Sequence, residues 1–513
     1  MRYKLLQTLC FMGILFASCK KSFIELTNPN AVGISPFYTS ETDVLLALNG
    51  CYSAMRSNSA LGEESDLYTD QRSDDTGTND NQSNAGEPFQ FNNFSLLPTN
   101  SYLLAHWQAM YKVLSQCNLL LANVDKVPFT DSLKPQYVGE TKFLRALINF
   151  HLVRKWGDIP MVTVPLNTPA EITAATFRVP AAQVYKQIVA DLSDAYKSGI
   201  PAVQPAGNRG HASMQAVTYL LGQVYLTRWA TLDGGNSGAA SNSDLDSANY
   251  YLTACYNMRT FTNLSSIPYS DVFSVAKKAS CPELIWQIVY LQGDVTYYSH
   301  IAADAQAKGE TIDSKKVATG IGANVTHDLV NEYEVNDPRA AFSIKYANDP
   351  IVKDWFITKF RDTSAVAGVN GYGGNDWPMM RYADVILMLA EVNMYKGNTA
   401  AAVQYLDMVR TRAGMPTYEV SSTTDPVYMQ KFPTLKLALL HERRSELAFE
   451  HHRWYDLLRW FNINDLVTYM HAKNQADWGL AAIANFSTKD EYYPIPYNEY
   501  ILDTKRMYQN PGY

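Results

Sequence analysis

The sequence predicts a mainly α-helical protein, because apolar residues recur every three to four positions through most of the chain while strand-like alternation is sparse. Of its 513 residues, 47% are apolar, 18% are charged and 12% are aromatic, which is the composition of a folded protein. This length allows two or three ordinary domains or one large helical body.

The apolar stripes place the helices in order along the chain. The first three stripes are Val44, Leu48, Tyr52 and Met55; then Trp107, Met110, Tyr111, Leu114 and Leu121; then Leu144, Leu147, Ile148 and Leu152, in a helix that Gly157 and Pro160 close. Further helices are expected at about 181–197, 213–230, 245–259, 383–396, 399–413, 434–450 and 454–461. The best strand candidate is Leu284 to Tyr290.

Several of these helices follow one another as hairpins. The clearest hairpin joins 383–396 to 399–413 through a tight Gly397-Asn398 turn, and a weaker one spans 213–259. One such unit is close to the tetratricopeptide length of about 34 residues. Because a single hairpin cannot bury its apolar face alone, we expect the hairpins to stack.

Two long stretches, 59–101 and 290–380, interrupt the helices. They are rich in Ser, Asn, Asp and Gly, yet they carry many aromatic residues and do not look disordered. Loops of this length in a folded protein are usually functional.

The charge of the chain argues against nucleic acid as a partner. Its 43 Lys and Arg stand against 50 Asp and Glu, which gives a net charge of −7, and no basic run exceeds a few residues. We therefore expect a neutral or zwitterionic partner.

The N-terminus predicts export and lipid anchoring. Arg2 and Lys4 precede an apolar stretch from Leu5 to Phe16 that is too short to span a bilayer but suits a signal peptide. Small residues then lead to Cys19, the pattern that a lipoprotein signal peptidase reads, although an ordinary signal peptide with an incidental Cys19 is the alternative. No comparable apolar run follows, so acyl chains on Cys19 would be the membrane anchor.

The remaining cysteines and acidic residues give no metal signature. Cys51, Cys117, Cys255 and Cys281 form no CxxC or Cys/His cluster, and either disulfides or buried free thiols fit them. The loop from Asp233 to Asp244 looks faintly like a calcium loop but lacks a ligand at its third position. We expect no metal and no cofactor.

An ordered series of motifs resembles a known family over nearly the whole chain. The motifs are Cys19 to Leu26, His106 to Tyr111, Gly139 to Ala146, Val153 to Pro160, Arg381 to Val385, Val409 to Gly414, Glu442 to Glu450, Arg453 to Leu457, Pro494 to Pro496 and Gln509 to Tyr513. In this order and spacing they resemble the SusD/RagB family of Bacteroidetes-type outer-membrane nutrient-binding lipoproteins.

This resemblance implies four tetratricopeptide-like helical hairpins that support an irregular, loop-rich ligand-binding half. It also implies oligosaccharide binding, or peptide binding as in some branches, and a lid position on a TonB-dependent transporter of the SusC type. The chain would divide into a signal peptide (1–18), an N-terminal region (19–230) and a C-terminal region (231–513) that form one intertwined body. The protein would be lipid-anchored in the outer membrane and face the cell surface, although Lys20 and Lys21 stand where surface-exposed members often carry acidic residues.

Acidic residues near the C-terminus could suggest a glycoside hydrolase. Glu442, Glu446 and Glu450 are spaced to share one helix face, but arginines interleave with them. Carboxylates among arginines stay ionised, which suits ion pairs better than a general acid. His441-Glu442 lacks the second His of an HExxH helix, and no GxSxG elbow or P-loop is present. We therefore expect no catalytic residues.

The binding chemistry is better supported by the aromatic residues of the two loop stretches. Aromatic faces attract the C–H faces of sugars, and neighbouring Asn, Asp and Gln can bond the hydroxyls. Peptide binding would instead need main-chain hydrogen-bonding groups in a cleft. The candidate ligand-binding residues are Tyr68, Phe89, Phe91, Tyr297, Tyr298, Trp355, Tyr372 and Trp377, with Tyr297 and Tyr298 foremost.

Overall fold

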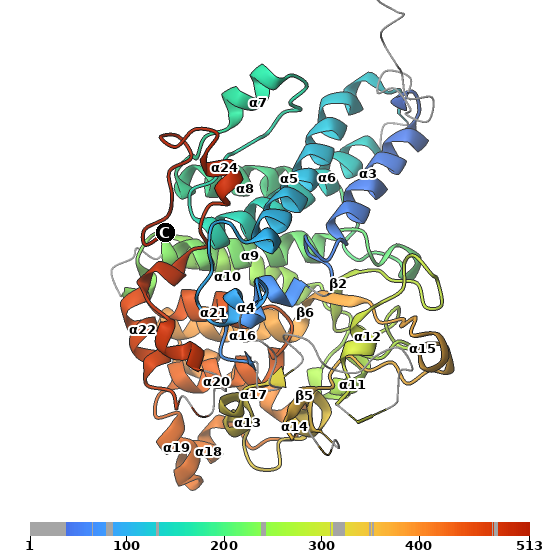
Figure 1. Cartoon of the computed structure of the whole chain (residues 1–513). Helices are drawn as coiled ribbons and strands as arrows, with labels where there is room; N and C mark the ends of the chain where they lie inside the picture. The colour runs from blue at the N-terminus through green and yellow to red at the C-terminus, as the bar shows by residue number, and fades with distance from the viewer. Residues whose placement is uncertain are drawn as a thin grey trace, which may run out of the picture.

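The fold is that of a computed structural model, which describes residues 37–63, 65–77, 86–129, 133–237, 243–307, 309–310, 324–347, 350, 353–474, 476 and 481–513. The expected signal peptide and Cys19 lie outside these residues. Helices dominate the described chain, as the sequence predicts (Figure 1). Among the described residues, no helix combines the length and apolar character that crossing a membrane requires.

The helical half is a stack of neighbouring helices. Its members are α3 (Glu41–Met55), α5 (Ser101–Asn123), α6 (Leu133–Trp156), α8 (Ala181–Lys197), α9 (Met214–Thr231), α10 (Ser243–Asn257), α16 (Tyr382–Tyr395) and α17 (Thr399–Arg412). The closest pairs are α6 with α8, α9 with α10 and α16 with α17, so both expected hairpins are confirmed. The turn after α16 places Gly397 at φ 77°, a left-handed conformation that glycine adopts without strain.

Side-chain caps start these helices where the sequence offers Ser, Thr or Asn. The Ser40 hydroxyl accepts a hydrogen bond from the Asp43 N–H, and the Asp43 carboxylate accepts one from the Ser40 N–H, which completes a capping box at α3. Asn100 caps α5 and Ser213 caps α9 with a single bond each, in which the side-chain oxygen accepts the N–H of Leu103 and of Ala216. One continuous apolar core, from Val44 to Met507, runs through these helices.

Four C-terminal helices complete this half: α20 (Leu435–Leu447), α21 (Arg453–Trp460), α22 (Ile463–His471) and the short α24 (Tyr497–Tyr500). The expected helix 434–450 is wrong at its end. The backbone turns at Phe449 and His451, which have φ of 66° and 64°, so Glu450 lies beyond the helix rather than on one face with Glu442 and Glu446.

The irregular half contains two small antiparallel sheets. One has the strand order β1 (Thr76–Gly77), β3 (Asn324–Val325), β5 (Trp355–Ile357) and β4 (Ile344–Tyr346). The other pairs β2 (Leu284–Ile288), the expected strand, with β6 (Trp377–Arg381). Short helices connect the strands: α4 (Phe89–Asn92), α11 (Tyr269–Val272), α12 (Ile301–Asp304), α13 (His327–Glu332), α14 (Pro338–Ser343) and α15 (Ala365–Asn370). Three others lie at the surface: α7 (Pro169–Ala175), α18 (Tyr418–Thr424) and α19 (Pro426–Lys431).

The structure decides between disulfides and free thiols for the four cysteines it describes. Cys51, Cys117, Cys255 and Cys281 are buried free thiols. Burial raises the pKa of the Cys255 thiol to about 12, so this group is a protonated core side chain rather than a reactive nucleophile.

A buried array of ion pairs around α20 joins the two halves; we call it the ion array. Glu446 accepts hydrogen bonds from Arg339 (3.2 Å), Arg381 (2.6 Å) and Arg412. The further pairs are Glu442 with Arg339 and Arg410, Glu450 with Lys359 and Arg381, Arg443 with Asp384 and Asp456, Arg444 with Asp75 and Asp328, Arg453 with Asp74, and Glu283 with Arg381 and Arg412.

The electrostatics of the ion array fit ion pairing. Burial alone would raise the pKa of Glu446, but Arg412, Arg381 and Arg339 outweigh that effect and hold the pKa below its ordinary value. A carboxyl group held ionised cannot act as a general acid near neutral pH. The predicted structural role of Glu446 therefore agrees with its surroundings. Glu442 agrees through its buried ion pairs with Arg339 and Arg410.

Replacing Glu446 with Gln should lower the free energy of unfolding by about 3–5 kcal/mol, because three buried guanidinium groups lose part of their counter-charge. Urea denaturation followed by circular dichroism measures this loss. The matched control is Asp194→Asn, since the side chain of Asp194 is 55% exposed in its pair with Lys142 and should contribute only about 0–1 kcal/mol. Equal stability losses in both variants would contradict this account.

Candidate functional site

The two predicted loop stretches meet at Glu63. The buried Glu63 carboxylate accepts hydrogen bonds from the Ser299 hydroxyl (2.6 Å) and from the His300 N–H. Strand pairing adds a second junction, because Thr76 of β1 lies opposite Val325 of β3. Residues more than 200 positions apart in the sequence therefore contact one another in the interior.

Near this junction, loop segments that are joined by backbone hydrogen bonds carry several aromatic rings. The Leu291 N–H donates to the Tyr297 carbonyl (2.7 Å), and the Ser299 N–H donates to the Gly373 carbonyl (2.9 Å). The Tyr298 ring centroid lies 4.6 Å from that of Tyr372 and 4.2 Å from that of His300. The neighbouring Tyr297 is 43% exposed. We call Tyr297, Tyr298, His300 and Tyr372 the aromatic group.

An open hollow of about 250 Å³ adjoins the aromatic group; we call it the α3–β2 hollow. It is lined by Asn49, Tyr52, Ser53, Met55 and Arg56 of α3 and its end, by Gly207, Gly210 and His211, and by Gln287, Ile288 and Val289. Arg56 links the two features, because its guanidinium carbon lies 4.3 Å from the centroid of the Tyr297 ring.

Hydrogen bonds to residues outside the hollow hold Tyr52 and His211 of its lining in place. The Tyr52 hydroxyl donates to Glu140 (2.7 Å) and accepts from the Ala212 N–H (2.9 Å), while His211 Nδ1 lies 2.8 Å from the same Glu140 carboxylate. Exposed Asn49 and Ser53 add an amide and a hydroxyl at the rim. Aromatic faces beside fixed hydrogen-bonding groups are suited to a polyhydroxylated ligand.

The structure brings only some of the predicted aromatic residues together. Tyr297, Tyr298 and Tyr372 form the aromatic group, whereas Trp355 is half-buried on β5, where its ring lies 5.5 Å from that of Tyr346. Whether any of them contacts a ligand stays a prediction.

The other predicted aromatic residues are core side chains. The Tyr68 ring stacks on that of His106, with centroids 4.0 Å apart, and contacts the Phe91 ring edge to face. Phe89, two residues before Phe91, is also buried. The Trp377 ring packs on that of Phe360, with centroids 4.9 Å apart. Trp377 is 1% exposed, and the residues of β6 are buried on both faces of the strand except for the half-buried Met379. These four rings present no open face to a ligand in this structure.

Sequence reasoning missed Arg56, His211 and His300, and it assigned Tyr52 to an apolar helix stripe. Tyr52 does lie on that stripe, but its hydroxyl reaches Glu140, 88 positions away. Nothing local in the sequence marks these residues, because their neighbours come from distant segments. The polar tip of a tyrosine in an otherwise apolar stripe was the single available signal.

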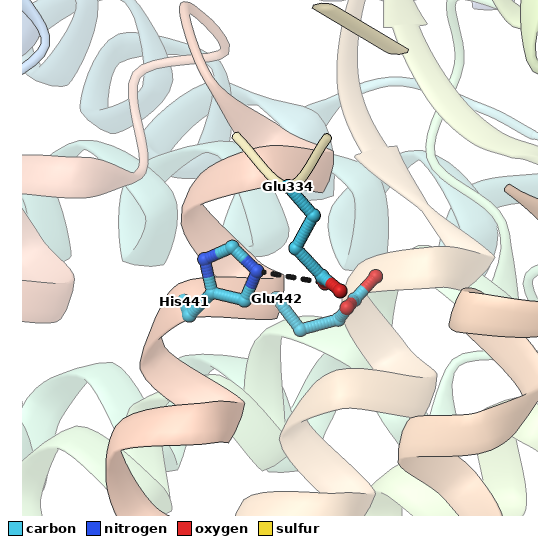
Figure 2. Close-up of side chains that lie close together, drawn as sticks. All are labelled: Glu334, His441 and Glu442. Atoms are coloured by element: carbon cyan, nitrogen blue, oxygen red, sulfur yellow. Dashed lines mark hydrogen bonds and ion pairs between the residues drawn. The ribbon is translucent and has the colours of Figure 1, made fainter. Parts of the chain in front are cut away.

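A second cluster, Glu334, His441 and Glu442, has metal-ligating side chains close together (Figure 2). Its atoms are already engaged: His441 lies 3.1 Å from Glu332 through Nδ1 and 3.1 Å from Glu334 through Nε2, and Arg410 donates to both Glu334 and Glu442. Burial would lower the pKa of His441, but the hydrogen bonds to Glu332 and Glu334 outweigh it and raise that pKa. A protonated imidazole has no lone pair for a metal, so we interpret the cluster as part of the ion array.

A third feature is a small pocket of about 40 Å³ between α6, α9, β6 and the 448–452 turn. His151, His451 and His452 line it, beside Arg154. Burial lowers the pKa of all three histidines, and the charges of Arg154 and Lys155 lower that of His151 further. The pocket is therefore lined by neutral imidazoles that couple folding to pH.

We expect the protein to lose stability as the pH falls below about 6.5, the ordinary pKa of histidine. In that pH range the histidines of the unfolded chain become protonated, whereas the buried His151, His451 and His452 of the folded protein stay neutral. Each group therefore lowers the free energy of unfolding by up to about 1.4 kcal/mol per pH unit. His441 works in the opposite direction, since its raised pKa contributes stability that is lost on going to higher pH. Melting temperatures between pH 7.5 and pH 5 measure the sum.

His451→Asn should flatten this pH dependence, because Asn does not titrate and tolerates the left-handed backbone of position 451. His327→Asn is the control, since the side chain of His327 is 44% exposed. A pH profile that is identical in wild type and His451→Asn would show that His451 does not contribute.

Comparisons with known proteins agree with this architecture. A family model described as "SusD family" matches residues 344–513, and one described as "Starch-binding associating with outer membrane" matches residues 38–226. SusD-like protein P2 of Formosa agariphila is 26% identical over 94% of this chain and 95% of its own length. A SusD-like protein of Bacteroides ovatus is 23% identical over 100% of this chain and 92% of its own length.

Solved structures show the same fold. A laminarin-binding SusD-like protein is 25% identical, with a TM-score of 0.72 over 93% of this chain and 100% of its own. Surface glycan-binding protein A from Bacteroides thetaiotaomicron, in complex with laminarihexaose, has a TM-score of 0.73 over 92% of this chain and 100% of its own. At 18% identity, the second likeness concerns the fold alone.

Proposed function

This chain belongs to the SusD/RagB family, and from that premise we propose that it binds an oligosaccharide at the aromatic group and passes it to a TonB-dependent transporter of the SusC type. The observation that carries the proposal is the aromatic group itself. Accessible rings of Tyr297, Tyr298 and Tyr372 adjoin a hollow with an amide, hydroxyls and an imidazole. Sugars need both an apolar face and hydrogen-bonding groups, and the site supplies both.

The relatives support a carbohydrate as the ligand class. One similar structure is a laminarin-binding protein and another holds laminarihexaose, both of them built on this fold. A peptide site would instead offer main-chain groups along a cleft. Several of the described residues that line the α3–β2 hollow, among them Asn49, Ser53 and Gln287, have polar side chains, which favours the sugar.

We propose that the protein binds without catalysis. Glycoside hydrolysis uses two carboxyl groups, one of which needs a raised pKa. The Glu442, Glu446 and Glu450 carboxylates are each bound by arginine or lysine inside the ion array, and no Asp or Glu lines the α3–β2 hollow. This arrangement suits a carrier that hands its ligand on unchanged.

The cellular place of the protein is proposed from the N-terminal sequence and the family. A lipidated Cys19 would anchor it in the outer membrane, facing the cell surface, where the transporter lies. The "Starch-binding associating with outer membrane" description of the matching family model agrees with this location.

Tyr298→Ala should weaken oligosaccharide binding about ten- to a hundredfold, or about 1–3 kcal/mol, because the ring that supplies the stacking face is removed. A glycan array identifies the ligand, and isothermal titration with that ligand measures the loss. Tyr250→Ala is the matched control, since Tyr250 is 59% exposed on α10, outside the aromatic group. If the Ala variants of Tyr297, Tyr298 and Tyr372 all bind as wild type does, the site lies elsewhere.

Cys19→Ala should leave the fold intact and release the protein from membranes, because acylation is the only apolar anchor that the sequence indicates. Fractionation of cells followed by a high-salt wash tests this. A variant that stays in the membrane fraction would contradict the lipid-anchor account.

A further inference from the structure

The wall of the α3–β2 hollow has an unusual charge for this acidic protein. Of the eleven residues that line it, Arg56 is the one with a permanent charge, and none is acidic. The other open hollow of similar size, beside α13, is lined by Asp328, Glu332, Lys431 and Lys473 together. A cation without a carboxylate in the wall of a hollow suits an anionic ligand.

Arg56 is not neutralised within the described part of the chain. Its guanidinium lies over the Tyr297 ring at 4.3 Å and near the Tyr290 ring at 6.0 Å, and it has no salt bridge there. Arginines elsewhere in the structure, such as Arg145 with Asp191, are bound to a carboxylate through two nitrogens. An arginine over an aromatic face keeps its N–H donors available for a carboxylate or sulfate.

Three carboxylates that contact residues around the hollow are occupied by other donors. Glu140, 5% exposed, accepts from Tyr52 and lies against His211. Asp376 is shared by Arg209 (2.6 Å) and Lys278 (3.0 Å), and Asp294 accepts the backbone N–H groups of its own turn. None of these three carboxylates lines the hollow. Arg56 is therefore the charged group that an entering ligand meets.

The hollow is rigid and of limited size. A Cβ atom at Gly210 would lie 2.7 Å from Val289, and the Trp286 indole N–H donates to the Gly210 carbonyl (2.9 Å), so the loop that carries His211 is packed tightly on β2. A volume of about 250 Å³ is below the roughly 300–1,000 Å³ of pockets for drug-sized ligands. It suits one sugar unit with its substituent rather than a whole chain.

We infer that the α3–β2 hollow binds an anionic sugar unit, bearing a carboxylate or a sulfate, with Arg56 as its partner, while the aromatic group stacks on the adjoining neutral units. This inference rests on the proposed function and names the ligand class more narrowly. It replaces the expectation, drawn from net charge alone, of a neutral or zwitterionic ligand.

A structural explanation of Arg56 competes with this one. Arg56 is the C-cap residue of α3, where a positive charge also stabilises the helix end by about 0.3–1 kcal/mol. Arg56→Lys keeps that charge but loses the planar pair of donors, whereas Arg56→Gln loses both. The two variants therefore separate a role in folding from a role in binding.

The experiment is a glycan array with carboxylated, sulfated and neutral glycans on matched backbones, followed by titration of the charged and neutral members of each bound pair. We expect the charged member to bind at least about tenfold more tightly, with an advantage that shrinks as NaCl rises from about 0.05 to about 0.5 M. Arg56→Gln should abolish the advantage and Arg56→Lys should reduce it, because the loss of affinity falls more heavily on the charged member of each pair than on the neutral one. Carboxylated and sulfated arms distinguish the two anion chemistries.

Four results overturn the inference. Equal affinity for the charged and neutral members of a pair shows that the site does not select an anion. A preference for the charged member that persists in Arg56→Gln shows that Arg56 is not the partner of the anion. Binding to neutral glycans alone refutes the anionic ligand but leaves the proposed function intact. Binding to no glycan at all refutes the proposed function as well.

Discussion

The ion array around α20 is the constraint on which the rest of the structure depends. Buried guanidinium and carboxylate groups are stable only when each charge is paired and hydrogen-bonded, because desolvation costs several kcal/mol per ion. Their partners come from distant segments: Asp74 and Asp75 precede β1, Glu283 precedes β2, Arg381 ends β6, and Arg410 and Arg412 lie on α17. An array of this kind tolerates few alternative arrangements, so it fixes how the irregular half sits on the helices.

The position of the candidate site follows from this constraint. Arg381 binds Glu283 and Glu446 at one end of the β2–β6 pair, and the Tyr382 N–H donates to the Glu283 carbonyl there. At its other end, β2 continues into Val289 of the α3–β2 hollow and then into the loop of the aromatic group, while the chain before β6 supplies Tyr372. A charged anchor thus holds one end of the sheet, and the loops of the candidate site extend from the other, as binding loops on a scaffold commonly do.

Charge has two separate uses in this protein. In the ion array, buried arginines are paired with buried carboxylates, and the lowered pKa of Glu446 follows from its three arginine neighbours. At the surface of the hollow, Arg56 lies on a tyrosine ring instead. The net charge of −7 conceals this difference, since it sums groups that are buried and paired with groups that a ligand can reach.

The sequence by itself determined the helices, because helical periodicity is a local property that a stretch of ten to twenty residues carries. The α16–α17 hairpin with its Gly397 turn was predictable from this periodicity. The β2 strand was predictable from its local residue pattern, and the ion-pairing role of Glu442 and Glu446 from the arginines that interleave with them. The tertiary structure alone decided which loop aromatics face solvent: Tyr298 and Trp377 belong to the same stretch, yet Trp377 is buried against Phe360 while Tyr298 lies in the aromatic group. Side-chain direction in such loops is set by contacts like Glu63 with Ser299, 236 positions apart, which no local pattern encodes.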